Sequence, residues 1–244
     1  MRILCYHSIE ISQKGKFTVT GAVLRRQLNY CRQKKFGIIS PLELLKKENL
    51  VKGRLMITFD DGYLDNYSVL LPLLNELNIP AIIFPVVGYI GQTNTWDLKG
   101  ELRGRELLDW DKIREMSNQG IIFGSHGMAH VDLCKLNDHE LEWELKESKR
   151  IMEEKLNNPV IAFSYPYGRY DERVKRFVKE AGYDYALALG AQGENNLNTA
   201  DYFALKRVAI YGDELPLVSW TKINGLYDFL SLATGIYLKP KSCI

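Results

Sequence analysis

The sequence predicts an α/β protein built around a parallel sheet. Short apolar runs, typical of buried strands, alternate with longer amphipathic runs, typical of helices, up to about residue 210. Three of the apolar runs lead directly into polar or turn-forming residues, and the carboxyl ends of parallel strands are where such proteins hold their functional groups. The alternation does not distinguish an open sheet from a barrel.

The chain has the size and composition of a single domain. Its 244 residues are 46% hydrophobic, which suits one large core, and no apolar run is long enough to span a bilayer. We expect one domain over residues 1–244, with the sheet within about 1–210 and an extension over about 211–244. The sequence of the extension favours a packed terminal helix, and contact with a membrane surface is the alternative.

Net charge and cysteine spacing indicate which kind of partner and which cellular compartment to expect. The chain carries 32 basic and 30 acidic side chains, a net charge of +2, which argues against nucleic acid as a partner. The cysteines form no CxxC pair. The first residues run into a strand without the apolar core of a secretory signal, so we expect a cytoplasmic protein.

The expected elements of the first half of the chain follow from apolar spacing. Residues 1–6 predict a strand and residues 21–34 a helix with one apolar face. Ser40 and Pro41 are typical of a helix start, so a short helix is expected over 41–47. The next expected elements are a strand at 55–59, a helix at 63–77, a strand at 81–87 and a surface loop at 94–108.

The second half of the chain repeats this pattern. Gly120 and Gly182 are typical of helix ends, and Asn137 with Glu140 has the spacing of a capping box. The expected elements are helices at 111–119, 141–156 and 171–181 and strands at 121–124, 160–163 and 185–189.

Two adjacent carboxylates, Asp60 and Asp61, follow the strand expected at 55–59 and precede Gly62. At the end of a buried strand they repel each other and lose hydration, which costs several kcal/mol unless a cation or a proton offsets it. Asp and Gly are also favoured in turns and at helix starts, so an ordinary turn is the alternative.

Two imidazoles, His126 and His130, follow the apolar run at 121–124. At this spacing they can lie on one side of a helical turn and reach one ion, and neutral imidazole is the commonest protein ligand for zinc. The alternative is a chance or structural pair. The pair therefore predicts a metal site only if the sequence supplies further ligands.

A third motif, at 164–168, reads Ser-Tyr-Pro-Tyr-Gly and follows the strand expected at 160–163. Aromatic, Pro and Gly residues in a turn can form the wall of a pocket and expose backbone N–H groups. An ordinary Pro-Gly turn has the same composition. All three motifs stand at the ends of expected strands, where a parallel sheet holds its site.

Together, the three motifs resemble those of the polysaccharide deacetylase family, the NodB-homology enzymes classed as family 4 carbohydrate esterases. The family's T-F-D-D-G stands at 58–62, its histidine motif at 126–130, and a form of R-x-P-[YF]-G at 164–168. Their order and spacing are similar to those of poly-N-acetylglucosamine deacetylases. The resemblance implies an irregular (β/α) barrel with seven strands.

The residues and the resemblance indicate the same catalytic roles. Asp61, His126 and His130 would hold one divalent ion, best matched by zinc, and leave positions for water and a carbonyl oxygen. Asp60 would then be free to act as the base. Non-haem iron oxygenases use similar ligands, but commonly in a different order along the chain.

The resemblance implies further roles in the pocket. The backbone N–H of Tyr167 would hold the oxyanion, and Pro166 and Gly168 would contribute to the substrate wall. Proteins of the same subgroup tend to begin with a strand followed by Tyr-His, so His7 would line the pocket as well. The alternative for His7 is a loop histidine bonded to the backbone.

Two departures from the family pattern affect the expected chemistry. Ser164 stands where the family has an arginine that orients the base, and Arg207 is the candidate substitute. The family's late histidine, which serves as general acid, is absent because no histidine follows His139. His7 is the candidate for that role.

We therefore expect a metal-dependent hydrolase that removes acetyl groups from N-acetylated sugars in a glycan or glycan precursor, acting on a linear amide C–N bond. A carbohydrate O-acetyl esterase is one alternative, because both reactions begin with attack on an acetyl carbonyl. A glycan-binding or assembly protein that keeps the metal site without turnover is another, because of the two departures.

Overall fold

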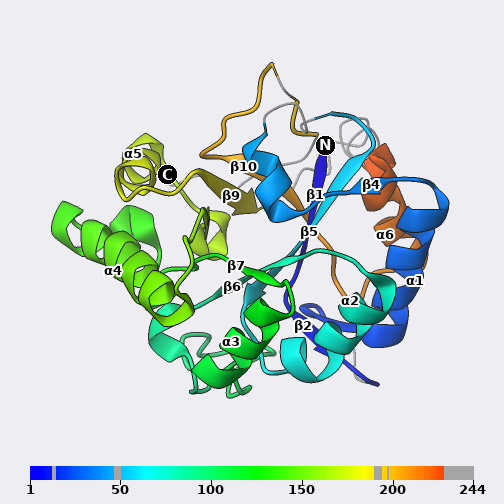
Figure 1. Cartoon of the computed structure of the whole chain (residues 1–244), viewed down its shortest axis with the longest axis horizontal. Helices are drawn as coiled ribbons and strands as arrows, with labels where there is room; N and C mark the ends of the chain where they lie inside the picture. Colours follow the sequence, from blue (N-terminus) through cyan, green and yellow to red (C-terminus); the bar gives the residue numbers. More distant parts are fainter. Residues whose placement is uncertain (13–14, 47–50, 190–193, 197, 228–244) are drawn as a thin grey trace.

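Strands and helices alternate through the computed structural model, which describes the chain apart from residues 13–14, 47–50, 190–193, 197 and 228–244 (Figure 1). The strands are β1 (Arg2–Tyr6), β2 (Ser8–Glu10), β3 (Thr18–Thr20), β4 (Gly37–Ile38), β5 (Arg54–Asp61), β6 (Ile82–Pro85), β7 (Ile122–Phe123), β8 (Ala162–Ser164), β9 (Tyr185–Leu189) and β10 (Leu205–Ala209). The α-helices are α1 (Gly21–Gln33), α2 (Leu71–Leu77), α3 (Trp110–Asn118), α4 (Asp138–Leu156), α5 (Glu172–Glu180) and α6 (Pro216–Asn224).

The parallel strands form a sheet that nearly closes into a barrel. Within the described residues the strands follow the order β7-β6-β5-β1-β10-β9-β8, and the short β4 pairs with β5 beside this path. The two ends of the sheet meet beyond β7, where the Ser125 N–H donates to the Ala162 carbonyl at 3.0 Å and the Ser164 N–H donates to the Ser125 carbonyl at 2.9 Å. The sheet is the seven-stranded (β/α) barrel that the motifs led us to expect.

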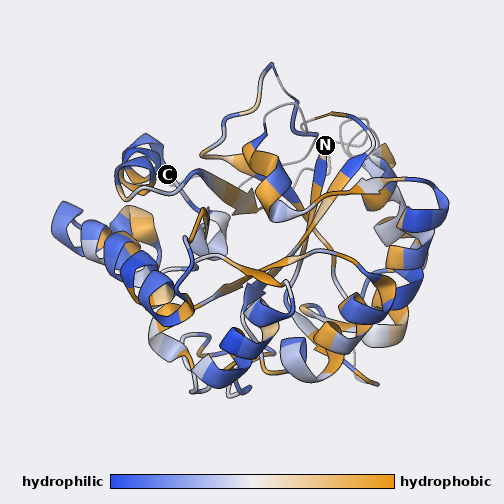
Figure 2. Ribbon diagram, in the orientation of Figure 1, coloured by the Kyte–Doolittle hydropathy of each residue, from blue (hydrophilic) through white to orange (hydrophobic). Residues whose placement is uncertain are grey.

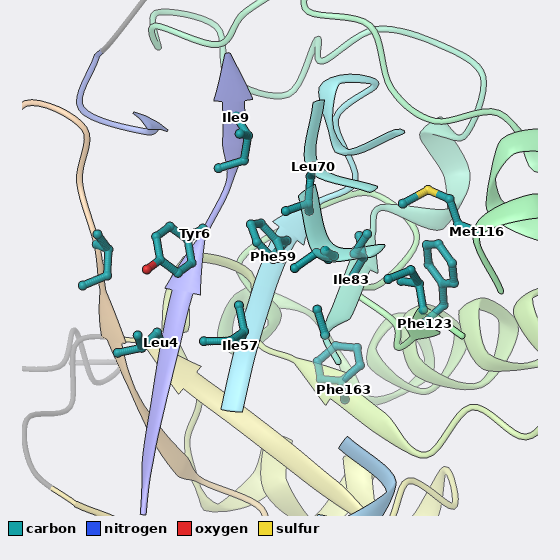
Figure 3. Packing of buried hydrophobic residues seen from close by; sticks show 14 of the residues in the cluster. Leu4, Tyr6, Ile9, Ile57, Phe59, Leu70, Ile83, Met116, Phe123 and Phe163 are labelled. Atoms are coloured by element: carbon teal, nitrogen blue, oxygen red, sulfur yellow. The ribbon is translucent and has the colours of Figure 1, made fainter. Parts of the chain in front are cut away.

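Alternation of side chains along the strands creates two apolar cores. On the outer side, Leu4, Ile57 and Phe59 pack with residues of the surrounding helical segments, such as Leu70 and Met116 (Figure 3). On the inner side, a second cluster fills one end of the barrel with Ile3, Met56, Phe84, Leu187 and Leu205, among others. Hydrophobic residues accordingly follow the strands, while α4 and α5 turn hydrophilic faces outward (Figure 2).

Two expected helices take a different form. The segment expected to be helical over 41–47 forms a 3-10 turn at Pro41–Leu45, which Ser40 and Glu43 cap reciprocally. The helix expected over 63–77 is delayed, because Tyr63 pairs with Leu107 in an isolated bridge. A wide π-helical turn at Asn66–Leu70 then leads into α2.

Two strands also differ from expectation. The strand expected at 55–59 extends over Arg54–Asp61, so both carboxylates belong to β5 and pair with β6 rather than forming a separate turn. The strand β10 was not expected as a separate element. It places Arg207 inside the barrel, which is decisive for the site described below.

The extension begins with α6, which packs beside α1 through Tyr30 and Trp220, whose ring centroids are 6.5 Å apart. Residues 228–244 lie outside the described residues, so the choice between a packed tail and a membrane contact stays a prediction. No helix of the described chain combines the length and apolar character needed to cross a membrane. The cellular compartment also stays a prediction.

Candidate active site

The polar site lies at the carboxyl-terminal end of the barrel interior. Inward-facing positions on β5 run from Met56 through Thr58 to Asp60, and those on β10 run from Leu205 to Arg207. Because successive side chains alternate between the two faces of a strand, each of these strands contributes an apolar side chain deep in the barrel and a polar one nearer its mouth.

Asp60 is held by several donors on neighbouring strands. Arg207 binds it in a two-point contact, with Nη1 to Oδ1 and Nη2 to Oδ2 both at 2.7 Å. The Ser164 hydroxyl accepts from Arg207 Nη2 at 2.8 Å and donates to Asp60 Oδ2 at 3.2 Å. The Cys5 thiol lies 3.6 Å from the same oxygen. Such a planar fork on a carboxylate fixes its orientation as well as its charge.

The electrostatic surroundings keep Asp60 ionised. Burial acts to raise the pKa of this carboxyl, but the charge and hydrogen bonds of Arg207 outweigh burial and hold the pKa well below its usual range. Arg207 itself is fully buried, so the two side chains form an ion pair inside the barrel. Asp60 is therefore an oriented, charged acceptor.

A second group brings together Asp61, His126 and His130, whose ligand atoms all lie within 4.8 Å of one another. Asp61 Oδ1 is 3.6 Å from His126 Nε2 and 3.4 Å from His130 Nε2. All three side chains are buried. The structure thus brings the predicted metal ligands to one point.

The protonation states in this group call for a cation. His126 Nδ1 lies 2.7 Å from the Ser164 carbonyl, which can only accept, so the proton is on Nδ1 and a lone pair is on Nε2. That lone pair faces Asp61 Oδ1, a buried acceptor with no hydrogen-bond partner among the described residues. Burial first, and then the charge of Asp60, raise the pKa of Asp61 to about 8. One cation would satisfy these facing acceptors, so the residues fit a divalent metal.

A second group of potential ligands, Cys5, His7 and Asp60, also lies within 4.8 Å of one another. Here the fit is poor, because the Arg207 guanidinium already occupies both oxygens of Asp60. A second cation beside that guanidinium would be repelled. The group is better described as the polar wall next to the metal centre.

The backbone at the site adopts conformations that are uncommon outside glycine. Asp61, His130 and Tyr167 have φ values of 71°, 51° and 59°. Such left-handed conformations cost of order 1–3 kcal/mol each and tend to occur at functional sites. Gly62 follows with φ of 75° and lies so close to Pro85 that an added Cβ would be 2.8 Å from the proline Cβ.

Glu144 of α4 supports the histidine loop, a role that the sequence analysis missed. Its Oε2 accepts from the backbone N–H groups of Met128 at 2.7 Å and Ala129 at 3.2 Å, between the two histidines. The side chain is buried. A sequence signal existed, because Glu144 falls on the apolar stripe of α4 together with Leu141 and Leu145.

The third motif lies beside the predicted metal ligands. The Tyr167 ring is 48% exposed, and its centroid is 4.5 Å from that of His130. Pro166 and Gly168 are buried on either side of it. Gly168 is confined, since an added Cβ would lie 2.6 Å from the Leu189 carbonyl oxygen.

His7 lies at the same site, next to Asp60. Its ring also packs edge-on against Phe17, with centroids 5.2 Å apart. Burial lowers the pKa of His7 to about 4, so the imidazole is neutral near neutral pH. The expectation that His7 lines the pocket is consistent with this position, while its chemical role stays a prediction.

Comparison with known proteins identifies the family. The family model for polysaccharide deacetylase matches residues 47–186, more than half of the chain. This chain belongs to the polysaccharide deacetylase family. The match spans all three motifs on which the resemblance was based, and the resemblance is therefore confirmed.

Relatives of this polysaccharide deacetylase are distant in sequence but similar in fold. The poly-β-1,6-N-acetyl-D-glucosamine N-deacetylase of Staphylococcus aureus is 23% identical over 209 residues, which are 81% of this chain and 69% of that protein. YxkH of Bacillus subtilis, named for the same family, is 27% identical over 214 residues, 85% of this chain and 70% of that protein. The Streptococcus pyogenes deacetylase PplD, solved with acetate, has a TM-score of 0.76 at 22% identity and covers 91% of this chain and 97% of its own.

Proposed function

We propose that this polysaccharide deacetylase is a metal-dependent hydrolase that removes N-acetyl groups from N-acetylated sugars in a glycan or glycan precursor. The observation that carries the proposal is that two adjacent carboxylates have different partners, an arginine for one and two histidines for the other. Asp61 presents a buried carboxylate oxygen to the Nε2 atoms of two histidines, while the adjacent Asp60 is held ionised by Arg207. We therefore assign the role of metal ligand to Asp61 and the role of base to Asp60.

The proposed metal is held by Asp61, His126 and His130. One carboxylate and two imidazoles suit zinc, and three protein ligands leave room for further ligands, as in catalytic rather than structural zinc sites. When bound, such an ion polarises the acetyl carbonyl and lowers the pKa of water. Other divalent metals suit the same donors, so zinc is the proposal and not the sole possibility.

The chain's own residues would then move the protons. Water attacks the acetyl carbon, and Asp60 takes its proton. The backbone N–H of Tyr167 stabilises the negative charge on the carbonyl oxygen. The C–N bond breaks, acetate leaves, and the amine nitrogen receives a proton. We propose His7 as the group that passes on that proton, because its ligand atom lies within 4.8 Å of an oxygen of Asp60.

The substrate is proposed from relatives and from the site together. A Staphylococcus aureus relative is named for poly-β-1,6-N-acetyl-D-glucosamine, and we extend an N-acetylglucosamine glycan to this chain as the substrate class. The exposed ring of Tyr167 supplies a flat apolar surface beside the metal ligands for such a sugar. Pro166 and Gly168 are proposed to contribute to the same substrate wall.

The contact of Arg207 with Asp60 supports the proposed role of Asp60 as the base. Ser164 replaces the motif arginine, but Arg207 contacts Asp60 in the two-point manner that an orienting arginine requires. This contact favours turnover over a protein that merely binds glycan. An O-acetyl esterase remains the second candidate, because the same groups would act on an acetyl ester.

The test is acetate release from short N-acetylglucosamine oligomers, with bound metal quantified in each protein. We expect wild type to release acetate, Asp60→Asn to keep metal without activity, and His126→Ala to lose both. An O-acetylated sugar is assayed in parallel. Release from the ester alone would make the protein an esterase, and a metal-loaded wild type that releases acetate from neither substrate would overturn the proposed hydrolase.

A further inference from the structure

We propose that the loop of residues 90–108, called here the Trp96 loop, completes the metal centre from outside the family motifs. Its Trp96 fixes the ring of His130, and its Asn94, bonded to Tyr63, fixes the segment that carries Asp61. The inference rests on the proposed metal site and adds residues that position its ligands. These residues are positioning residues and not ligands.

The two histidine ligands are oriented in different ways. His126 is held by its Nδ1 hydrogen bond to the Ser164 carbonyl, the usual arrangement for a metal-binding imidazole. His130 Nδ1 is buried and has no hydrogen-bond partner among the described residues. Its ring instead packs against two aromatic rings, with its centroid 5.1 Å from Trp96 and 4.5 Å from Tyr167. Packing therefore replaces the missing hydrogen bond.

The angle between the Trp96 and His130 rings suits Trp96 to holding the imidazole in one orientation. Its plane is tilted by 32° to that of His130, whereas Tyr167 meets the imidazole at 69°, close to edge-on. Contact with two rings at different angles restricts rotation of the imidazole about its side-chain bonds. Tyr89 supports Trp96 from behind, with ring centroids 5.0 Å apart.

The third ligand, Asp61, lies two residues before a second contact with the same loop. The Asn94 side-chain amide donates to the Tyr63 oxygen at 2.8 Å. Tyr63 and Asn94 are both 1% exposed, so water does not compete with this bond. The segment that carries Asp61 is thus tied to the Trp96 loop, while Asp61 Oδ1 faces the imidazoles.

Trp96 and Asn94 belong to the same turn of the loop, and this turn is anchored by hydrogen bonds. Asn94 Oδ1 accepts from the backbone N–H of Asp97 at 3.2 Å, which closes the turn around Trp96. Isolated strand pairs, Thr93 with Glu106 and Tyr63 with Leu107, fasten the loop to itself and to the segment after β5. A change at Asn94 therefore reaches both the turn around Trp96 and the segment that follows Asp61.

The experiment measures zinc affinity, by competition with a chromophoric chelator, in the full chain. We expect Trp96→Ala, Asn94→Ala and Tyr63→Phe to weaken zinc binding about 10–100-fold, the usual effect of losing a residue that supports a ligand. Trp96→Phe keeps an aromatic face and should lose less. The control is Trp143→Ala, because this tryptophan is 50% exposed on α4. Circular dichroism checks that each variant is folded.

The outcomes separate this inference from the proposed function. If wild type binds zinc and the folded Trp96 and Tyr63 variants bind it within about twofold of wild type, the inference is overturned and the metal site stands. If wild type binds no divalent metal, the metal site itself falls and the inference falls with it. Tyr63→Phe removes one hydroxyl and keeps the ring, so it remains informative if the alanine variants do not fold.

Discussion

Replacing Arg207 by methionine should strongly destabilise the protein. The Asp60 carboxylate would lose two hydrogen bonds of 2.7 Å and its countercharge in a place where its side chain is 3% exposed. Removing one partner of a buried pair costs about 3–5 kcal/mol, since the other charge stays desolvated. At about 2–4 °C per kcal/mol for a chain of this size, the thermal midpoint should fall by roughly 6–20 °C.

The assay is thermal and urea unfolding, with Lys206→Met as the matched control. Lys206 is the preceding residue on β10, and its side chain is exposed on the opposite face, so this change should stay within about 0.5 kcal/mol. The double variant Asp60→Asn with Arg207→Met should lose less than the sum of the single losses, because no charge is left unpaired. Equal losses for Arg207→Met and Lys206→Met would refute the reasoning.

Three further predictions concern the supports of the site. Glu144→Ala should cost at least about 2 kcal/mol in urea unfolding, because two backbone N–H groups of the histidine loop lose their acceptor, whereas Glu142→Ala on the exposed face should be neutral. Gly62→Ala should destabilise more than Gly104→Ala, since both have φ of 75° but nothing lies within 4 Å of a Cβ added at Gly104; equal losses would exclude a packing effect. Zinc at 100 times its dissociation constant should stabilise wild type by about 2.7 kcal/mol in thermal scans. The same zinc should leave His126→Ala unchanged, and stabilisation of that variant would place the ion elsewhere.

The predictable part of this molecule is the part encoded locally. Asp60 and Asp61 are adjacent, and His126 and His130 belong to one short motif, so the sequence brings each pair together before any folding is considered. Their place at the ends of apolar strands then follows from the parallel sheet. The alternation of strands and helices likewise predicted the fold class. The prediction that the sheet closes into a barrel came only from the family resemblance.

The less predictable part depends on contacts between distant segments. Asp60 and Arg207 are 147 residues apart, and their pairing needs β5 and β10 to flank β1 and the inward register of β10. The segment of β10 was not assigned as a strand, so Arg207 was named only as a candidate substitute for the motif arginine. The supports Glu144, Tyr63 and Asn94 were missed because their partners lie on other elements.

The departure at the third motif illustrates why register matters more than motif position. Ser164 and Arg207 are both inward-facing near the mouth of the barrel, and Arg207 Nη2 lies 2.8 Å from the Ser164 hydroxyl. A long side chain at Ser164 would compete with Arg207 for the same space, whereas serine leaves room and adds a hydrogen bond to Asp60. The two residues are therefore complementary. In a closed barrel any strand can deliver an orienting cation to Asp60 from its last inward position, and here β10 does so in place of β8.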